Sequence, residues 1–104
     1  MRGKTVSYLR DALEQCGYDF DVAMNPTSRS RIYADLRAIV WRIYTLELCR
    51  TSGQTARAFH RSREAVHYSL VKAQTLIGRD RNFTDLYDSV YGYYNNAKAN
   101  ATTV

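Results

Sequence analysis

Hydrophobic residues recur every three or four positions along most of this chain, a spacing that places them on one face of a helix. The pattern predicts a long helix over residues 29–50. Its buried stripe is expected to contain Ile32, Leu36, Ile39, Val40, Ile43 and Leu46. Trp41 and Leu48 lie off this stripe, so we expect a second element, best supplied by the N-terminal helix, to cover them. No segment alternates cleanly as a strand would, and the predicted fold class is all-α.

Residues 1–27 are predicted to supply one helix and an irregular connection. The helix spans residues 5–16, and Gly17 can end it in a left-handed conformation. Its inward face would contain Val6, Leu9, Leu13 and Cys16. Residues 18–27 include Asn25-Pro26, a pair that interrupts a helix.

Two shorter helices with clear start signals follow the long one. Thr51–Gln54 has the sequence of a capping box and would start a helix over residues 52–59. Ser62 is a suitable N-cap for a helix over 63–77, and Gly78 can follow its last turn. The inward residues are expected to be Ala56 and Phe59 in the first helix, and Val66, Leu70, Ala73 and Ile77 in the second.

The C-terminal helix is predicted over residues 82–96, with Asn82 as its cap, and residues 97–104 are expected to form a disordered tail. Its inner stripe would be Leu86, Val90 and Tyr93, with a second, aromatic stripe of Tyr87, Tyr91 and Tyr94. We favour packing of this aromatic stripe against the N-terminal helix. The alternative is an exposed face for self-association or for a protein partner.

These elements add up to one domain, residues 1–104, built as a small bundle of about five helices. A chain of this length can bury a core without disulfides or metal. The two cysteines, Cys16 and Cys49, are best explained as free, partly buried thiols in a reducing cytoplasm. With His60 and His67 they match no zinc spacing, so no metal or cofactor is predicted. No signal peptide and no apolar run of roughly 20 residues occurs, which favours a cytoplasmic protein away from membranes.

Positive charge is concentrated in the middle of the chain. The net charge is +5, and residues 28–81 carry 11 basic and 4 acidic side chains, whereas both flanking segments are slightly acidic. A local basic field suits a polyanion, and nucleic acid is the commonest one. The alternative is a solvated basic surface that only improves solubility.

Two arginine-rich segments give this charge a specific interpretation. Arg61 and Arg63 bracket the N-cap Ser62, where a phosphate could meet two guanidinium groups and free helix N–H groups. An arginine here can also bind guanine in the major groove. We rank Arg63 below Arg61, because Arg63 leans toward the core side of the helical wheel. The second segment, Ser28–Arg31, could enter a minor groove or contact phosphates, or it could be an ordinary solvated helix start.

Residues 29–78 resemble the C-terminal DNA-binding domain of DnaA, the bacterial replication initiator. That family has a basic loop of the form R-S-R-x-x-A-x-x-R, matched here by Arg29–Arg31, Ala34 and Arg37. A short helix ending in Ala58-Phe59 matches its next motif, and residues 61–66 stand where the following motif lies, with Ser62 in place of an aspartate and Arg63 in place of a histidine. The resemblance implies a helix-turn-helix of the Trp-repressor type. This sequence lacks the ATPase motifs of the full initiator. It is therefore similar to a free-standing version of the domain, of the kind that phages and mobile elements carry.

The resemblance implies a sequence-preferring, double-stranded DNA-binding protein in replication or transcriptional control. It assigns Arg29 and Arg31 to the minor groove. It assigns the turn and the next helix start to the major groove, namely Arg61, Ser62, Arg63, Glu64 and Ala65. We add Arg37, Thr51 and the outward-facing Tyr68 to the expected DNA-binding set. Glu64 and Ala65 stand where the family has threonine, so the DnaA box is not predicted as the target.

Two other classes of protein remain as alternatives. The first is a protein-interaction module that keeps the fold without reading DNA. The second is an enzyme, which we do not predict. The chain lacks a Ser/His/Asp set, paired carboxylates or a phosphate-binding glycine loop at useful spacing, so no small-molecule substrate is expected either.

Overall fold

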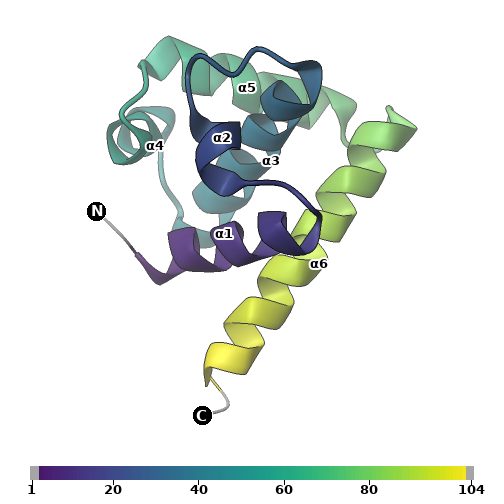
Figure 1. Ribbon diagram of the computed structural model, residues 1–104. Helices are drawn as coiled ribbons and strands as arrows, with labels where there is room; N and C mark the ends of the chain where they lie inside the picture. Colours follow the sequence, from purple (N-terminus) through teal and green to yellow (C-terminus); the bar gives the residue numbers. More distant parts are fainter. Residues whose placement is uncertain (1–2, 103–104) are drawn as a thin grey trace.

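A computed structural model, which describes residues 3–102, contains six α-helices and no strand within those residues (Figure 1). The helices are α1 (Lys4–Gln15), α2 (Phe20–Met24), α3 (Arg31–Leu48), α4 (Ser52–Phe59), α5 (Arg63–Leu76) and α6 (Arg81–Thr102). The all-α class is confirmed. The helix count exceeds the expected five because α2 forms inside the segment expected to be an irregular connection.

Helix α2 exists because both of its ends are chemically defined. The side chain of Asp19 accepts a hydrogen bond from the backbone N–H of Val22 at 2.9 Å, which caps the N-terminus. Phe20 and Ala23 are buried against the core. Asn25 then accepts from the N–H of Thr27 and ends the helix in a turn. A helix of only five residues shows too little periodicity to be recognised in a sequence.

Helix α3 lies at the centre of the molecule and contacts all five other helices. Four predicted core positions, Leu36, Ile39, Val40 and Ile43, are fully buried. Leu46 was expected in the same stripe but is 48% exposed, because no neighbouring helix covers that side of the last turn. Trp41 is buried as expected, but its cover differs. The ring of Phe59 packs edge-on against it at 6.1 Å, and the guanidinium of Arg61 lies over it.

Helix α6 is longer than predicted and begins earlier. Asp80, not Asn82, caps it, since Asp80 accepts from the N–H of Phe83 at 2.8 Å. The segment expected as a disordered tail is helical as far as Thr102, and residues 103–104 lie outside the described residues. In Figure 1, α6 crosses α1 and extends past the rest of the molecule.

The inner face of α6 is rotated relative to the prediction. Its buried residues are Phe83, Tyr87, Val90 and Tyr94. Tyr93, expected inside, is 39% exposed. The ring of Tyr94 meets Tyr8 of α1 edge-on at 6.0 Å, so this member of the aromatic stripe packs against the N-terminal helix, whereas Tyr91 is hydrogen-bonded to Glu47 of α3. Tyr87 and Tyr94 are covered within the chain, so neither ring forms part of an exposed tyrosine face.

One carboxylate ties the end of α3 to α6. Glu47 accepts hydrogen bonds from the hydroxyl of Tyr91 at 2.7 Å and from the hydroxyl of Tyr94 at 3.3 Å. The ammonium of Lys98 donates to the same carboxylate at 3.1 Å. The hydrogen bond from Tyr91 is the main reason that the pKa of Glu47 lies below its ordinary value of 4.5. The same bond raises the pKa of Tyr91 to about 12.

We expect Glu47→Gln to lower the free energy of unfolding by about 0.5–1 kcal/mol at pH 7, since a neutral amide is a weaker acceptor than a carboxylate and solvent partly screens the site. The pKa of Glu47 is depressed in the folded state, so its stabilisation is present above the unfolded pKa and is lost as the pH falls through the folded value. Urea unfolding of both proteins at pH 7 and near pH 3 measures this difference.

The matched control is Glu14→Gln, which removes the same charge from an exposed side chain of α1. The control should leave the pH dependence of stability close to that of the wild type. An equal stability loss at both pH values for Glu47→Gln would show that the carboxylate charge does not hold α6.

Candidate functional site

Helices α4 and α5 and the three residues between them, 60–62, form the most clearly specified local structure. The capping box is confirmed: the N–H of Gln54 donates to the Thr51 hydroxyl at 3.1 Å, and the N–H of Thr51 donates to the Gln54 side chain at 2.9 Å. Ser62 caps α5 as predicted, accepting from the N–H of Ala65 at 3.1 Å. His60 has a positive φ of 55°, which turns the chain between the two helices.

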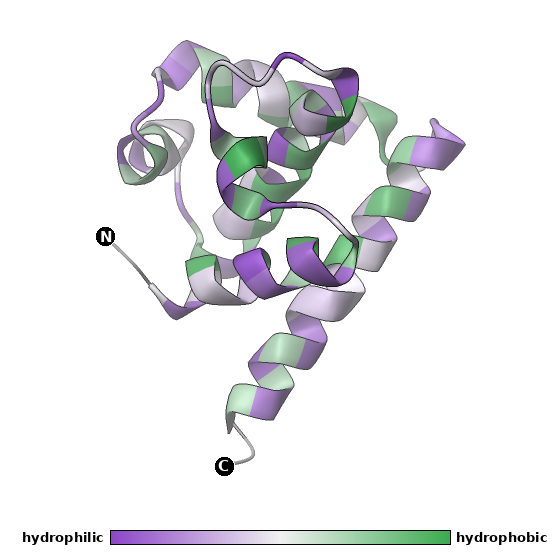
Figure 2. Cartoon of the chain, viewed as in Figure 1, coloured by the Kyte–Doolittle hydropathy of each residue, from purple (hydrophilic) through white to green (hydrophobic). Residues whose placement is uncertain are grey.

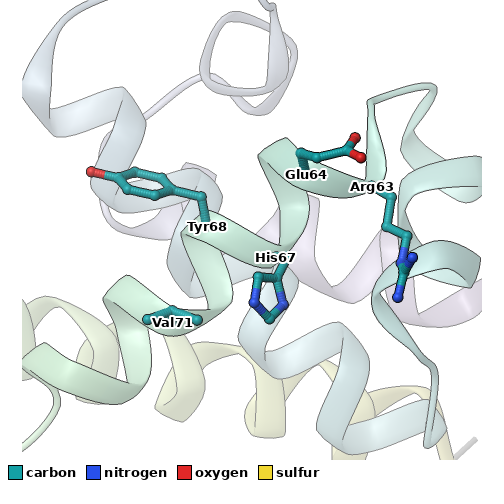
Figure 3. Close-up of a pocket in the computed structure, with 5 residues that line it drawn as sticks. All are labelled: Arg63, Glu64, His67, Tyr68 and Val71. Atoms are coloured by element: carbon teal, nitrogen blue, oxygen red, sulfur yellow. The ribbon is translucent and has the colours of Figure 1, made fainter.

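The outward face of α5 is an exposed surface with unpaired polar groups. It comprises Arg63, Glu64, His67, Tyr68 and Val71, which line a shallow hollow (Figure 3). Tyr68 is 73% exposed and Val71 46%, so two large hydrophobic side chains stay in solvent here. None of these five side chains has a hydrogen bond or ion pair within residues 3–102. The turn and the start of α5 are also hydrophilic (Figure 2).

Sequence reasoning found three of these five residues and missed two. His67, considered above as a zinc ligand, is exposed, and Val71 was not considered. Both follow from helical geometry, because 64, 67, 68 and 71 repeat at the spacing of one helix face. Ala65, predicted in the same set, is partly buried and forms part of a neighbouring cleft instead.

Arg61 does not lie on this outward surface, contrary to the ranking from the sequence. Its Nη1 donates to the carbonyl of Met24 at 3.2 Å, and its guanidinium carbon lies 5.3 Å from the centre of the Trp41 ring. Burial lowers the pKa of the Arg61 guanidinium. Arg63, ranked below it, is exposed. The helical wheel could not place Arg61, which precedes α5, and it put Arg63, the first residue of α5, on the wrong side of the helix.

Arg37 is also held by backbone groups. Its Nη1 donates to the carbonyl of Ala23 at 2.9 Å and to that of Ser28 at 3.2 Å, with a longer contact to Asn25 at 3.5 Å. Burial, and then the charge of Arg61, lower the pKa of Arg37. The two arginines therefore fix the end of α2 and the α2–α3 loop, residues 25–30, against α3 and the α4–α5 turn.

The two remaining predicted arginines lie at different places. Arg29 is exposed in the α2–α3 loop, directly after the residue that Arg37 holds. Arg31 is exposed at the first position of α3 and lines a separate hollow with Asp35 and Asp80, beside the start of α6. The contact between Arg61 and Met24 ties the end of α2 to the turn before α5, whereas Arg29 lies near the far end of the α2–α3 loop, two residues before α3 begins.

Other kinds of site find little support in the described residues. Cys16 is partly buried and Cys49 is exposed, and both are free thiols. Within residues 3–102, no group of three or more His, Cys, Asp or Glu side chains could hold a metal ion. In that same part of the chain, every helix is too short or too polar to cross a lipid bilayer.

Comparisons with protein-family models, with curated proteins and with solved structures find no match for this chain. The similarity of residues 29–78 to the DnaA domain therefore stays a hypothesis that rests on the quoted motifs. The functional interpretation has to rest on the geometry of α5, the turn before it and the α2–α3 loop.

We expect Arg61→Ala to lower the free energy of unfolding by about 1–2 kcal/mol, because it removes both a cation–π contact and a hydrogen bond to a partly buried carbonyl. Arg63→Ala removes an exposed side chain of the same type and should stay within about 0.5 kcal/mol of the wild type. Thermal and urea unfolding of the two variants measures the contrast. Equal stability of both would refute a structural role for Arg61.

Proposed function

We propose that this protein binds double-stranded DNA with sequence preference, with α4 and α5 forming a helix-turn-helix whose second helix enters the major groove. The observation that carries the proposal is the outward face of α5, from Arg63 to Val71, which is exposed and whose polar groups are unpaired. A helix of this kind fits the major groove, which is about 12 Å wide. The basic charge of residues 28–81 supports the same partner.

Each residue of that face has a natural role on DNA. Arg63 can donate two hydrogen bonds to guanine O6 and N7, and Glu64 can accept from cytosine N4. Tyr68 and Val71 offer apolar contact to a thymine methyl group. Because Ser62 already satisfies the N–H of Ala65, the first two N–H groups of α5 remain for a phosphate.

Arg29 is the proposed arm residue for a minor groove or a phosphate. Its exposure and its place directly after Ser28, whose carbonyl Arg37 holds, support this role. Arg31 is a weaker candidate, since the hollow that it lines also contains the carboxyl groups of Asp35 and Asp80. The role as a free-standing relative of the DnaA domain, in replication or transcriptional control within the cytoplasm, remains part of the proposal.

A protein-interaction module is the second candidate function. The buried tyrosines of α6 no longer support it, but the exposed Tyr68 and Val71 would also suit a protein partner. The basic surroundings of this face favour DNA over a protein. The experiment below separates the two, because a protein-binding face has no reason to enrich one duplex sequence over others.

Selection from a random duplex library, followed by sequencing, should enrich one motif with the wild-type protein. Arg63→Ala should then weaken binding to that motif by about 1–3 kcal/mol and relax preference at one base pair, as measured by fluorescence anisotropy. Lys4→Ala on α1 is the matched control, because it also removes one exposed basic side chain. Failure of the wild type to retain any duplex at low salt would end the proposal and favour the protein-interaction alternative.

Arg29→Ala should act differently from Arg63→Ala. If Arg29 neutralises one phosphate, its loss weakens binding to all duplexes alike and flattens the slope of log affinity against log salt by about one unit. Lys4→Ala again serves as the control for the change in net charge. An unchanged slope together with unchanged affinity would remove the α2–α3 loop from the DNA-binding surface.

A further inference from the structure

A small cleft lies between α3 and α5, next to the outward face of α5. It measures about 200 Å³, and its walls include Arg37 and Trp41 from α3, Arg61 from the turn, and Tyr68, Ser69 and Lys72 from α5. Tyr68 borders both this cleft and the outward hollow. The cleft is therefore adjacent to the surface proposed to enter the major groove, yet it contains different side chains.

The cleft contains two positive charges that the chain does not neutralise. Lys72 is paired with Asp35 at 2.7 Å, so its charge is balanced within the fold. Arg37 and Arg61 make no ion pair in residues 3–102. Each of the two side chains donates to backbone carbonyls through its own Nη1. Carbonyl groups satisfy a donor without cancelling its charge.

Two partly buried guanidinium groups that repel each other are unfavourable unless an anion joins them. The repulsion is visible in the pKa of Arg37, which burial lowers most and the charge of Arg61 lowers further. The nitrogens not used for carbonyls give each guanidinium further N–H donors, and the Ser69 hydroxyl adds another. Guanidinium groups match the geometry of phosphate oxygens, and charge-assisted hydrogen bonds of this kind are the strong ones.

We propose that the cleft formed by Arg37, Arg61 and Ser69 binds a phosphate group, supplied by the DNA backbone at the edge of the groove that α5 enters. The backbone source rests on the proposed function, whereas the phosphate site itself does not. Arg37 and Arg61 thereby bind a backbone phosphate without contacting the bases. Sequence preference comes from the outward face of α5. The phosphate contact in the cleft positions the duplex, and Arg63 and Glu64 contact the edges of its bases.

The test places a carboxylate in the cleft. Ser69→Asp supplies an internal partner for the two guanidinium groups and should exclude a phosphate. The slope of log affinity against log salt should then become less steep by about one unit, so that the loss of affinity between 50 and 200 mM salt becomes roughly fourfold smaller. The selected sequence motif should be unchanged. Ser89→Asp, at an exposed position on α6, makes the same substitution outside the cleft and corrects for net charge.

A second measurement needs no DNA. Inorganic phosphate, compared with chloride at equal ionic strength, should raise the melting temperature of the wild type and of Ser89→Asp, and should not raise that of Ser69→Asp. Should Ser69→Asp fail to fold, Ala34→Asp on the facing wall introduces the same charge from α3.

The outcomes separate this inference from the proposed function. Duplex binding with equal slopes for Ser69→Asp and Ser89→Asp overturns the backbone contact and leaves the proposed function standing. Equal slopes together with a phosphate effect lost only in Ser69→Asp assign the cleft to a free phosphate. If the wild type binds no duplex, the proposed function fails. A phosphate effect specific to the cleft would then still support the anion site, and its absence would overturn it.

Discussion

The guanidinium group of Arg61 lies over the Trp41 ring of α3 and donates a hydrogen bond to the carbonyl of Met24 in α2, and these two contacts hold the turn before α5 in place. Arg61 joins the turn before α5 to the end of α2, where the loop that contains Arg29 begins. A hydrogen bond from arginine to a backbone carbonyl is directional, whereas the contact with the indole ring is broad. Together these two contacts hold the α4–α5 turn, residues 60–62, which has no apolar side chain of its own.

Holding the loop in this way has an electrostatic consequence. Arg37 and Arg61 both satisfy carbonyl groups from partly buried positions, which brings two like charges together without a carboxylate. The fold accepts this repulsion, and an anion bound between them would relieve it. In the proposed anion site, structural support and anion binding would use the same two side chains, whereas Arg63 is exposed.

The acidic and aromatic half of the molecule has a separate role. Helix α6 packs on α1 and α3 through buried rings, and Glu47 collects hydrogen bonds from Tyr91, Tyr94 and Lys98. This cluster stabilises the C-terminal helix well past the point where its sequence loses apolar residues. Tyr87 and Tyr94 thus serve the interior, whereas Tyr68 and Val71 on α5 are among the large hydrophobic side chains that stay exposed in the described part of the chain.

The sequence by itself determined the all-α class, the capping residues Thr51 and Ser62, and most of the α3 core, because helix periodicity and capping depend on neighbours in the chain. It also placed the positive charge in residues 28–81. Only the tertiary structure decided that Arg61 turns inward and Arg63 outward, and that α6 buries Tyr94 instead of Tyr93. These outcomes depend on contacts with Trp41, Met24 and Tyr8, which are distant in the sequence, so no local pattern could encode them.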